Sequence, residues 1–392
     1  MEIKMDEKSK NRSDFTTGSI PKMLFSFSIP FFLTNLIQAF YNIADIMVLG
    51  KFCGKEGIAG ASIGGNVTFT VTYMIIGLCN GGAIMTAQYA GAKNEKDMKE
   101  TISSTFGLML FFAVLSTVLS FLFTGSILEV LNTPTEAFEK TAEYFRICML
   151  GSIFIFGYNS VCAILRGLGN SKVPMYFGIF SCVLNILLDL LLVGGFRLDV
   201  KGAAFATVIS QTVALIGCIV YLKHENFPFD FKPKSFRINR EKALNILKLG
   251  LPGCIQNMIV SGGFLMVSSI TNSIGLNAAS GVAVAQKVNN FAQMPATAVG
   301  MAVSSMVGQN VGAEKYDRAR STMKWAMLMS MAVGIVMFLI VQSNPIGIMR
   351  LLVDEEDVLI TAEPYLRITA CDYLLVALIF PLNGLCNGSG HT

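Results

Sequence analysis

Charged residues are scarce in this sequence, and their scarcity is the first constraint on what the chain can be. Only 14% of the 392 residues are Asp, Glu, Lys or Arg, against about 25% in ordinary soluble domains. The nine cysteines are scattered without a CxxC pair or a Cys/His cluster, which argues against a zinc site or a disulfide framework. The phosphate-binding pattern GxxxxGK[ST] is also missing, which argues against an ATP-driven activity.

Apolar sequence takes the place of the missing charge. Hydrophobic residues make up 53% of the chain, and the mean hydropathy is +0.58. Apolar runs of about 20 residues, the length that crosses a bilayer core of about 30 Å, follow one another almost from end to end. They predict an all-α polytopic membrane protein with about ten spanning helices, at 23–49, 62–90, 101–124, 142–165, 173–195, 202–222, 243–271, 278–308, 321–342 and 363–387.

The basic residues predict the orientation of these spans. Most of the 30 Lys and Arg residues fall on one side, including those of the loop "KHENFPFDFKPKSFRINREK", while the other side includes the acidic run "DEED" at 354–357. The positive-inside rule then predicts a multi-pass protein of the cell membrane with a cytoplasmic N-terminus. Residues 1–22 form a polar tail before a span too long for a signal-peptide core, so no cleaved leader is expected. The net charge of +4 needs no nucleic-acid partner to explain it.

The chain repeats itself at one constant offset. "TAQYAGAKNEKDMKET" at 86–101 aligns with "VGQNVGAEKYDRARST" at 307–322, and at the same offset "RGLGNS" at 166–171 aligns with "NGSGHT" at 387–392. The repeat predicts two homologous lobes. Because the first has an even number of spans, a pseudo-twofold axis along the membrane normal should relate them. The predicted organisation is a tail at 1–22, a six-helix lobe at 23–223, a basic inter-lobe loop at 224–242, and the first four helices of a second lobe, truncated by two, at 243–392.

Polar side chains follow one face of the first predicted span. Asn35, Gln38, Asn42 and Asp45 recur at spacings of three and four, which places them on one side of a helix as a stripe that ends in an acid. An ionised carboxylate inside a membrane is costly, and such acids are functional-site candidates by default. The stripe therefore predicts the lining of an internal cavity. Acids that merely lie near helix ends at the membrane surface are the alternative interpretation.

A second acid lies in the fifth predicted span, in the stretch "NILLDLLLVGG". Asn185 and Asp189 are four residues apart and share a helix face. In alternately directed helices, Asp45, Asp189 and Thr207 fall at one level near the outer side. Two carboxylates, an amide oxygen and a hydroxyl could bind a hard cation, or the two acids could share a proton. The predicted cation-coupling set is Asp45, Asn185, Asp189 and Thr207, which would be metal ligands if the ion is Na+, and no other cofactor is expected.

Several stretches together resemble the multidrug and toxic compound extrusion (MATE) transporters: "PFFLTNLIQAFYNIADIMVLGKF", "TAQYAGAKN", "LRGLGNSKVP", "NILLDLLLVGG", "GAAFATVISQ" and "VGQNVGA". The resemblance implies a secondary active transporter and not an enzyme. Such a protein exports organic, often cationic and amphipathic drugs or metabolites in exchange for Na+ or H+ by alternating access of two six-helix lobes. Its partners would be small organic molecules and membrane lipids, and we expect a monomer.

The resemblance also bears on individual residues. It marks Asp45, Asn185, Asp189 and Thr207 as the cation site found in the N-terminal lobe of one branch of the family. It also suggests that the first helix bends at Pro30, although a static kink kept for packing is an alternative.

The second half of the chain lacks an equivalent acid. The repeat places Met266 or Val267 opposite Asp45, so ion coupling is expected in the first lobe. Asp372 is expected at the outer membrane surface, and Lys287 either faces the cavity or reaches the outer surface.

A flippase for lipid-linked oligosaccharide precursors, built on the same two-lobe plan, is the alternative function. It should line its cavity with basic residues, of which the first six spans have almost none.

Overall fold

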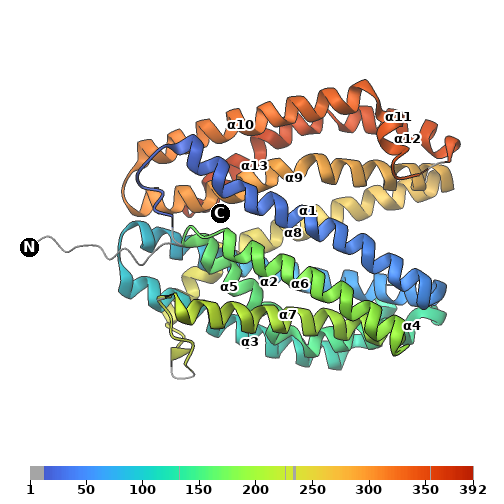
Figure 1. The fold of residues 1–392 in the computed structure, drawn as a ribbon, viewed down its shortest axis with the longest axis horizontal. Helices are drawn as coiled ribbons and strands as arrows, with labels where there is room; N and C mark the ends of the chain where they lie inside the picture. The colour runs from blue at the N-terminus through green and yellow to red at the C-terminus, as the bar shows by residue number, and fades with distance from the viewer. Residues whose placement is uncertain (1–12, 132, 226, 233–234, 354, 392) are drawn as a thin grey trace, which may run out of the picture.

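The structure is a computed structural model that describes residues 13–131, 133–225, 227–232, 235–353 and 355–391. Residues 1–12 of the predicted tail, and 226 and 233–234 of the predicted inter-lobe loop, lie outside the described residues. Every secondary-structure element in the described residues is a helix (Figure 1). Its elements are α1 (Ile20–Phe52), α2 (Gly54–Gly91), α3 (Glu95–Val130), α4 (Thr135–Leu150), α5 (Ser152–Gly167), α6 (Lys172–Asp189), the π-helical segment η1 (Leu190–Gly195), α7 (Asp199–His224), α8 (Arg240–Ile274), α9 (Leu276–Gly312), α10 (Tyr316–Ser343), α11 (Pro345–Met349), α12 (Glu356–Thr369) and α13 (Asp372–Ser389).

The number of helices that could cross a membrane is smaller than the ten spans predicted. Within the described residues, seven helices are long and apolar enough, or nine if each of two bent pairs is one span. The predicted spans 142–165 and 363–387 are these pairs: α4 and α5 meet at 55°, and α12 and α13 at 46°. The remaining predicted span, 278–308, falls on α9, which is 37 residues long but does not belong to the apolar set. Apolar runs alone could not reveal the bends, because hydropathy does not record helix direction.

The turns that follow α2 and α9 show the internal repeat in the backbone. Lys93 and Glu314, which correspond to each other at the repeat offset, both have positive φ, at 54° and 58°. At the first of these turns the side chain of Asn94 accepts a hydrogen bond from the amide of Asp97 and caps α3. At equivalent positions just after α2 and α9, a residue with left-handed backbone conformation therefore lets the chain reverse direction.

The helices form two groups, and one helix from each half of the sequence crosses from its own group to the other. In Figure 1, α2 to α7 lie together below, α9 to α13 lie together above, and α1 and α8 cross between them. The first turns of α1 bury Leu24, Phe27 and Phe31 against α9 of the other group. The first turns of α8 bury Ile246 and Cys254 against α2, α3 and α5. Each crossing helix therefore ties its own group to the other one.

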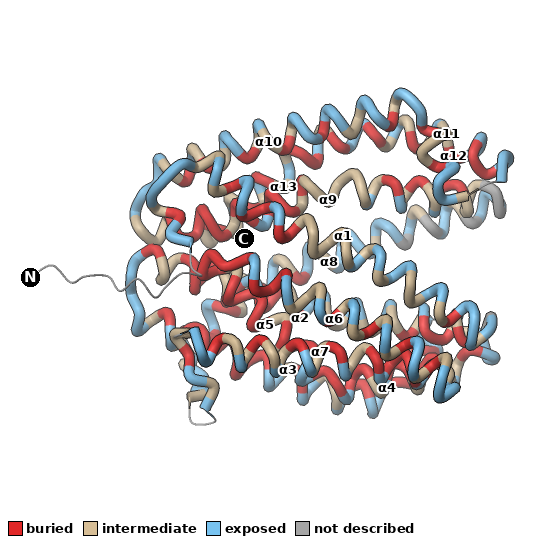
Figure 2. Tube along the Cα trace, in the orientation of Figure 1, coloured by how far each residue is buried: buried red, intermediate tan, exposed pale blue. Residues whose placement is uncertain are grey.

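The two ends of the seam between the groups differ in packing. At one end, residues 83–91 of α2 meet residues 302–312 of α9, and most of these residues are buried (Figure 2). We name this the closed end. Toward the other end, α8 leaves the packed seam, and Ile259 and Met266 are 70% and 71% exposed. Among the described residues, the tight contact between α2 and α9 is at the closed end.

Candidate functional site

The two predicted acids meet where α1 runs beside α6 and α7. Asp189 is the last residue of α6 and is only 1% exposed, while Asp45 on α1 is half-buried. The carboxyl groups approach closely enough to interact. Neither oxygen of Asp189, however, has a partner in hydrogen-bond geometry among the described residues. A buried carboxylate without such a partner, next to a second carboxylate, needs a proton or a cation to neutralise it.

Asn185 and Thr207 complete the predicted set. Asn185 lies one turn before Asp189 on α6 and is 3% exposed. Its Nδ2 lies 3.5 Å from the hydroxyl of Thr207 on α7, which donates to the carbonyl of Ala203 at 3.0 Å. These bonds leave the amide oxygen of Asn185 without a partner among the described residues. The structure therefore brings together all four residues that the sequence analysis grouped.

The orphaned acceptors extend one turn along α7. Gln211, four residues after Thr207 and thus on the same face, also has a buried side-chain oxygen without a hydrogen-bond partner in the described part of the chain. The unpartnered side-chain atoms of Asn185, Asp189 and Gln211 are all oxygen acceptors. An all-oxygen set of this kind suits a proton or a hard monovalent cation. The sequence analysis named Thr207 but missed Gln211, because residue spacing does not show that a side-chain oxygen is buried without a partner.

A π-helical segment follows Asp189 directly. Over Leu190–Gly195 the helix widens, and the amide of Phe196 donates to the carbonyl of Leu191 five residues earlier at 2.8 Å. Single π turns are frequent at functional sites because they redirect side chains within a continuous helix. The sequence pattern predicted an unbroken span here, and the pair Gly194–Gly195 was its one local signal of irregularity.

Two tyrosines that the sequence analysis did not single out adjoin the acids. Tyr41, one turn before Asp45, interacts with both carboxyl groups and with the hydroxyl of Thr207. Tyr144 on α4 is 8% exposed and also lies beside Thr207. Its ring packs against Gly64 of α2, where a Cβ would lie 3.0 Å from the tyrosine Cδ1. A phenol hydroxyl can donate a hydrogen bond to a carboxylate and can accept one, so both tyrosines belong to the chemistry of the site.

The rest of the polar stripe is less enclosed than Asp45. Asn35 is half-buried, whereas Gln38 and Asn42 are exposed. Pro30 is buried inside α1, which runs on as one helix, and the hydroxyl of Thr34 donates to the carbonyl of Pro30 at 2.8 Å. The missing amide hydrogen of proline leaves a weak point in the helix several turns before Asp45.

The second group of helices has a different polar cluster. Gln293 Nε2 lies 3.3 Å from Asp372, which is exposed at the start of α13. The hydroxyl of Tyr373 donates to Asn289 at 2.6 Å, and Asn289 donates to Thr369 at 3.1 Å. These groups satisfy one another, unlike the acceptors around Asp189. Lys287 is exposed on α9 and remains outside both clusters.

Comparisons with known proteins show which sequences and folds this chain resembles. The MatE family model matches residues 30–191 and 252–392. The probable multidrug resistance protein YpnP of Bacillus subtilis (strain 168) is 31% identical over 380 residues, covering 96% of this chain and 84% of that protein. The multidrug export protein MepA of Staphylococcus haemolyticus (strain JCSC1435) is 23% identical over 96% of this chain and 83% of its own length. A solved outward-facing conformation of a multidrug resistance MATE family transporter of the MOP superfamily has the same fold, with a TM-score of 0.89, 21% identity, and coverage of 99% and 86%.

Proposed function

This chain belongs to the multidrug and toxic compound extrusion (MATE) family, a family of multi-pass membrane transporters, and we propose that it is a secondary active exporter. Its cargo is organic, cationic and amphipathic, either drugs or metabolites. It exchanges this cargo for Na+ or H+ by alternating access of the two helix groups. The family predicted from the sequence is confirmed, while the cargo class and the coupling ion are part of this proposal.

The pair of neighbouring acids, buried Asp189 and half-buried Asp45, is the observation that carries the proposal. Its acceptors face one another between α1, α6 and α7, and within the described residues Asp189 has no hydrogen-bond partner. A proton or Na+ satisfies them in one half of the cycle, with Asn185 and Thr207 supplying further oxygens. Cargo entry disfavours that ion, and the antagonism is reciprocal, because each ligand weakens the other by the same factor. This negative coupling is what makes the exchange obligatory.

The exposed part of the stripe has a separate role in the proposal. Gln38 and Asn42 line the space between the two groups through which the cargo passes, with Asn35 at the inner margin of this lining. Pro30 lets α1 change shape when Asp45 changes charge, which transmits ion binding to that lining.

The placement in the membrane follows from the charge distribution. We propose that the protein lies in the cell membrane as a monomer with a cytoplasmic N-terminus. The closed end, with Lys93 and Lys315 in its turns, then faces the cytoplasm. The conformation described here is accordingly closed toward the cell interior.

Translocation of a lipid-linked oligosaccharide is the second candidate function. It shares the two-group plan but calls for basic side chains that would bind a pyrophosphate. The site described above consists of acids, amides and hydroxyls instead, which favours a cationic cargo.

Uptake into proteoliposomes tests the proposal directly. The purified protein is reconstituted, a Na+ or an H+ gradient is imposed separately, and accumulation of a fluorescent organic cation is followed. One gradient should drive accumulation, and its dissipation should abolish it. Gradient-independent movement of a lipid-linked pyrophosphate, with no response of the cation to either gradient, would establish the flippase instead.

A further inference from the structure

Two glutamines in equivalent positions of the repeat join the helix groups at the closed end. Gln88 on α2 donates from Nε2 to the carbonyl of Gly388 on α13, at 3.0 Å. Gln309 on α9 donates from Nε2 to the carbonyl of Gly167 on α5, at 3.2 Å. The two donors correspond to each other at the offset of the sequence repeat, and so do the two acceptors. The two hydrogen bonds are therefore equivalent in the repeat. In one the donor lies in the first group and the acceptor in the second, and in the other this order is reversed.

Two glycines let the backbones that carry these glutamines touch. A Cβ on Gly91 would overlap the carbonyl oxygen of Gln309, and a Cβ on Gly312 would overlap that of Gln88. Any side chain at either position would force α2 and α9 apart. The seam is thus a backbone contact with one glutamine bond on each side.

A segment before α1 breaks this symmetry, and we name residues 13–17 the strap. Its Phe15 is 1% exposed, and the amide of Phe15 donates to Oε1 of Gln309 at 3.0 Å. The carbonyl of Phe15 accepts from Nδ2 of Asn310 at 3.2 Å and from Nε of Arg318 at 2.8 Å. Within the described residues, no chain segment is bonded to Oε1 of Gln88 in the same way. Of the two glutamines, Gln309 is the one that holds both the seam and the strap.

The strap also bridges the two groups at its ends. The amide of Ser13 donates to the carbonyl of Gly169 in the turn before α6, at 3.3 Å. Arg318 of α10 donates from its guanidinium to the carbonyl of Thr17 at 2.6 Å. The ring of Phe15 meets that of Phe27 on α1 edge to face at 4.7 Å. A segment bonded to both groups must let go of one of them when the groups separate.

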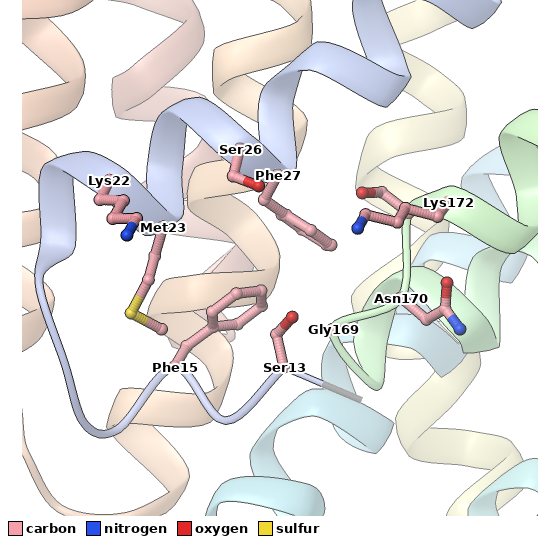
Figure 3. A pocket seen from close by; sticks show the side chains of 10 residues that line it. Ser13, Phe15, Lys22, Met23, Ser26, Phe27, Gly169, Asn170 and Lys172 are labelled. Atoms are coloured by element: carbon pink, nitrogen blue, oxygen red, sulfur yellow. The ribbon is translucent and has the colours of Figure 1, made fainter. Parts of the chain in front are cut away.

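The strap is not wedged in on all sides. A cavity of about 270 Å³ lies between the strap, the first turns of α1 and the turn before α6 (Figure 3). Ser13 and Phe15 line it from the strap, Lys22 and Phe27 from α1, and Lys172 from the start of α6. The strap can therefore leave its seat on that side without displacing a helix.

We propose that Gln88 and Gln309 are gating residues that hold the closed end shut, and that the strap makes the Gln309 side the stronger of the two gates. The closed end opens only when both glutamine bonds break and the strap releases one of the two groups, at Gly169 or at Gln309. The proposal rests on the proposed function only in assuming that this end opens during transport. The holding of the strap by Gln309 concerns the closed state and is testable without any transport measurement.

Hydrogen exchange read by mass spectrometry on the full chain in nanodiscs tests this asymmetry. Gln309→Ala removes the acceptor of the Phe15 amide, so exchange across residues 13–19 should accelerate about tenfold or more, as expected for about 1.4 kcal/mol from a lost buried hydrogen bond. Gln88→Ala is the matched control, because it loses one seam bond and leaves the strap bonded. It should change exchange over 13–19 by less than about threefold. Equal acceleration in both variants, or none in Gln309→Ala, would overturn the proposal.

Phe15→Ala keeps the test decisive if Gln309→Ala does not fold. It removes the buried ring but keeps the Gln309 to Gly167 bond, so the strap should exchange faster while residues 83–91 stay protected. Unchanged exchange over 13–19 in this variant would show that the strap is not held as described. Failure of the proteoliposome assay would leave these exchange results unaffected, so the two proposals can fail separately.

Discussion

The two helix groups share a backbone repeat but differ in the chemistry inside the predicted membrane. Asp45 on α1 is half-buried beside Asp189, whereas its repeat counterpart on α8 is Met266 or Val267, neither of which carries a charge. Beyond its first turn, α8 has no acid at all. Around Asp189 the acceptors lack partners among the described residues, while the polar residues near Asp372 satisfy one another.

This contrast separates two tasks of the repeated fold. At the closed end the halves keep equivalent residues, because Gln88 and Gln309 make the same bond to Gly388 and Gly167. That symmetry is what a seam between two lobes requires. The ion-coupling chemistry needs only one copy, and the described residues offer one copy, in the first group.

The largest effect is expected when the acids of the two helix groups are neutralised separately and their effects on efflux are compared. Asp189→Asn and Asp45→Asn should each fold, because an amide is cheaper to bury than a charge. Each should lower gradient-driven efflux on the order of 100-fold, since a coupling free energy of about 3 kcal/mol is lost. Efflux rates in proteoliposomes measure the effect.

Asp372→Asn is the matched control for that experiment, because it removes an acid from the second group. We expect its efflux rate to stay within about twofold of the wild type, as for an exposed group with a weak partner. An equal loss in the control would mean that coupling is shared between the groups.

A crosslink at the symmetric seam should stop turnover whichever group couples the ion. The ideal Cβ of Gly308 lies 2.9 Å from the Cβ of Ala87, which is shorter than the roughly 3.5–4.5 Å found across a disulfide, so the two helices must move slightly apart for the bond to form. Once formed, a disulfide between Ala87→Cys and Gly308→Cys should lower transport more than about tenfold, and reductant should restore it, because the lobes must separate there. Each single cysteine variant is the control. Undiminished transport in the fully crosslinked protein would contradict rocking about this seam.

Smaller effects are expected from the neutral residues around the acids. Asn185→Ala and Thr207→Val each remove one oxygen or one hydrogen-bonding group but leave both carboxylates in place. Each should weaken ion binding about tenfold, which corresponds to about 1.4 kcal/mol for one polar contact. The ion concentration for half-maximal efflux measures this. Thr369→Val, in the second group, serves as the control and should leave that concentration unchanged.

The smallest expected effect comes from Pro30. Pro30→Ala restores a backbone amide in α1 and should slow turnover about threefold, by stiffening the helix that links the acids to the lining. Pro252→Ala in α8 is the control, because Pro252 also lies inside a long helix and is one residue off the repeat offset from Pro30. It should slow turnover less, since α8 carries no coupling acid. Equal kinetics of both variants and the wild type would favour a static kink kept for packing.

Much of the candidate site could be predicted from residue spacing within single helices. Spacings of three and four placed Asp45 on the polar face of one helix, and Asn185 and Asp189 on one face of another. The alternating directions of the helices then placed Thr207 at the level of both acids. The bends at α4–α5 and α12–α13 could not be predicted, since tertiary contacts decide them and apolar runs continue through both. Gln88 and Gln309 could be recognised from the sequence only as matching positions of the repeat. Their hydrogen bonds could not be predicted, because the carbonyls that they bind lie 300 and 142 residues away in the sequence.

Counting the ions released when cargo binds tests directly whether Asp189 is the coupling acid. Detergent-solubilised protein is loaded with the coupling ion, an organic cation is added at saturation, and the released Na+ or H+ is counted per protein. The account predicts release from the wild type and from Asp372→Asn, and none from Asp189→Asn. Release of the same number of ions from Asp189→Asn would contradict the assignment of Asp189 as the coupling acid.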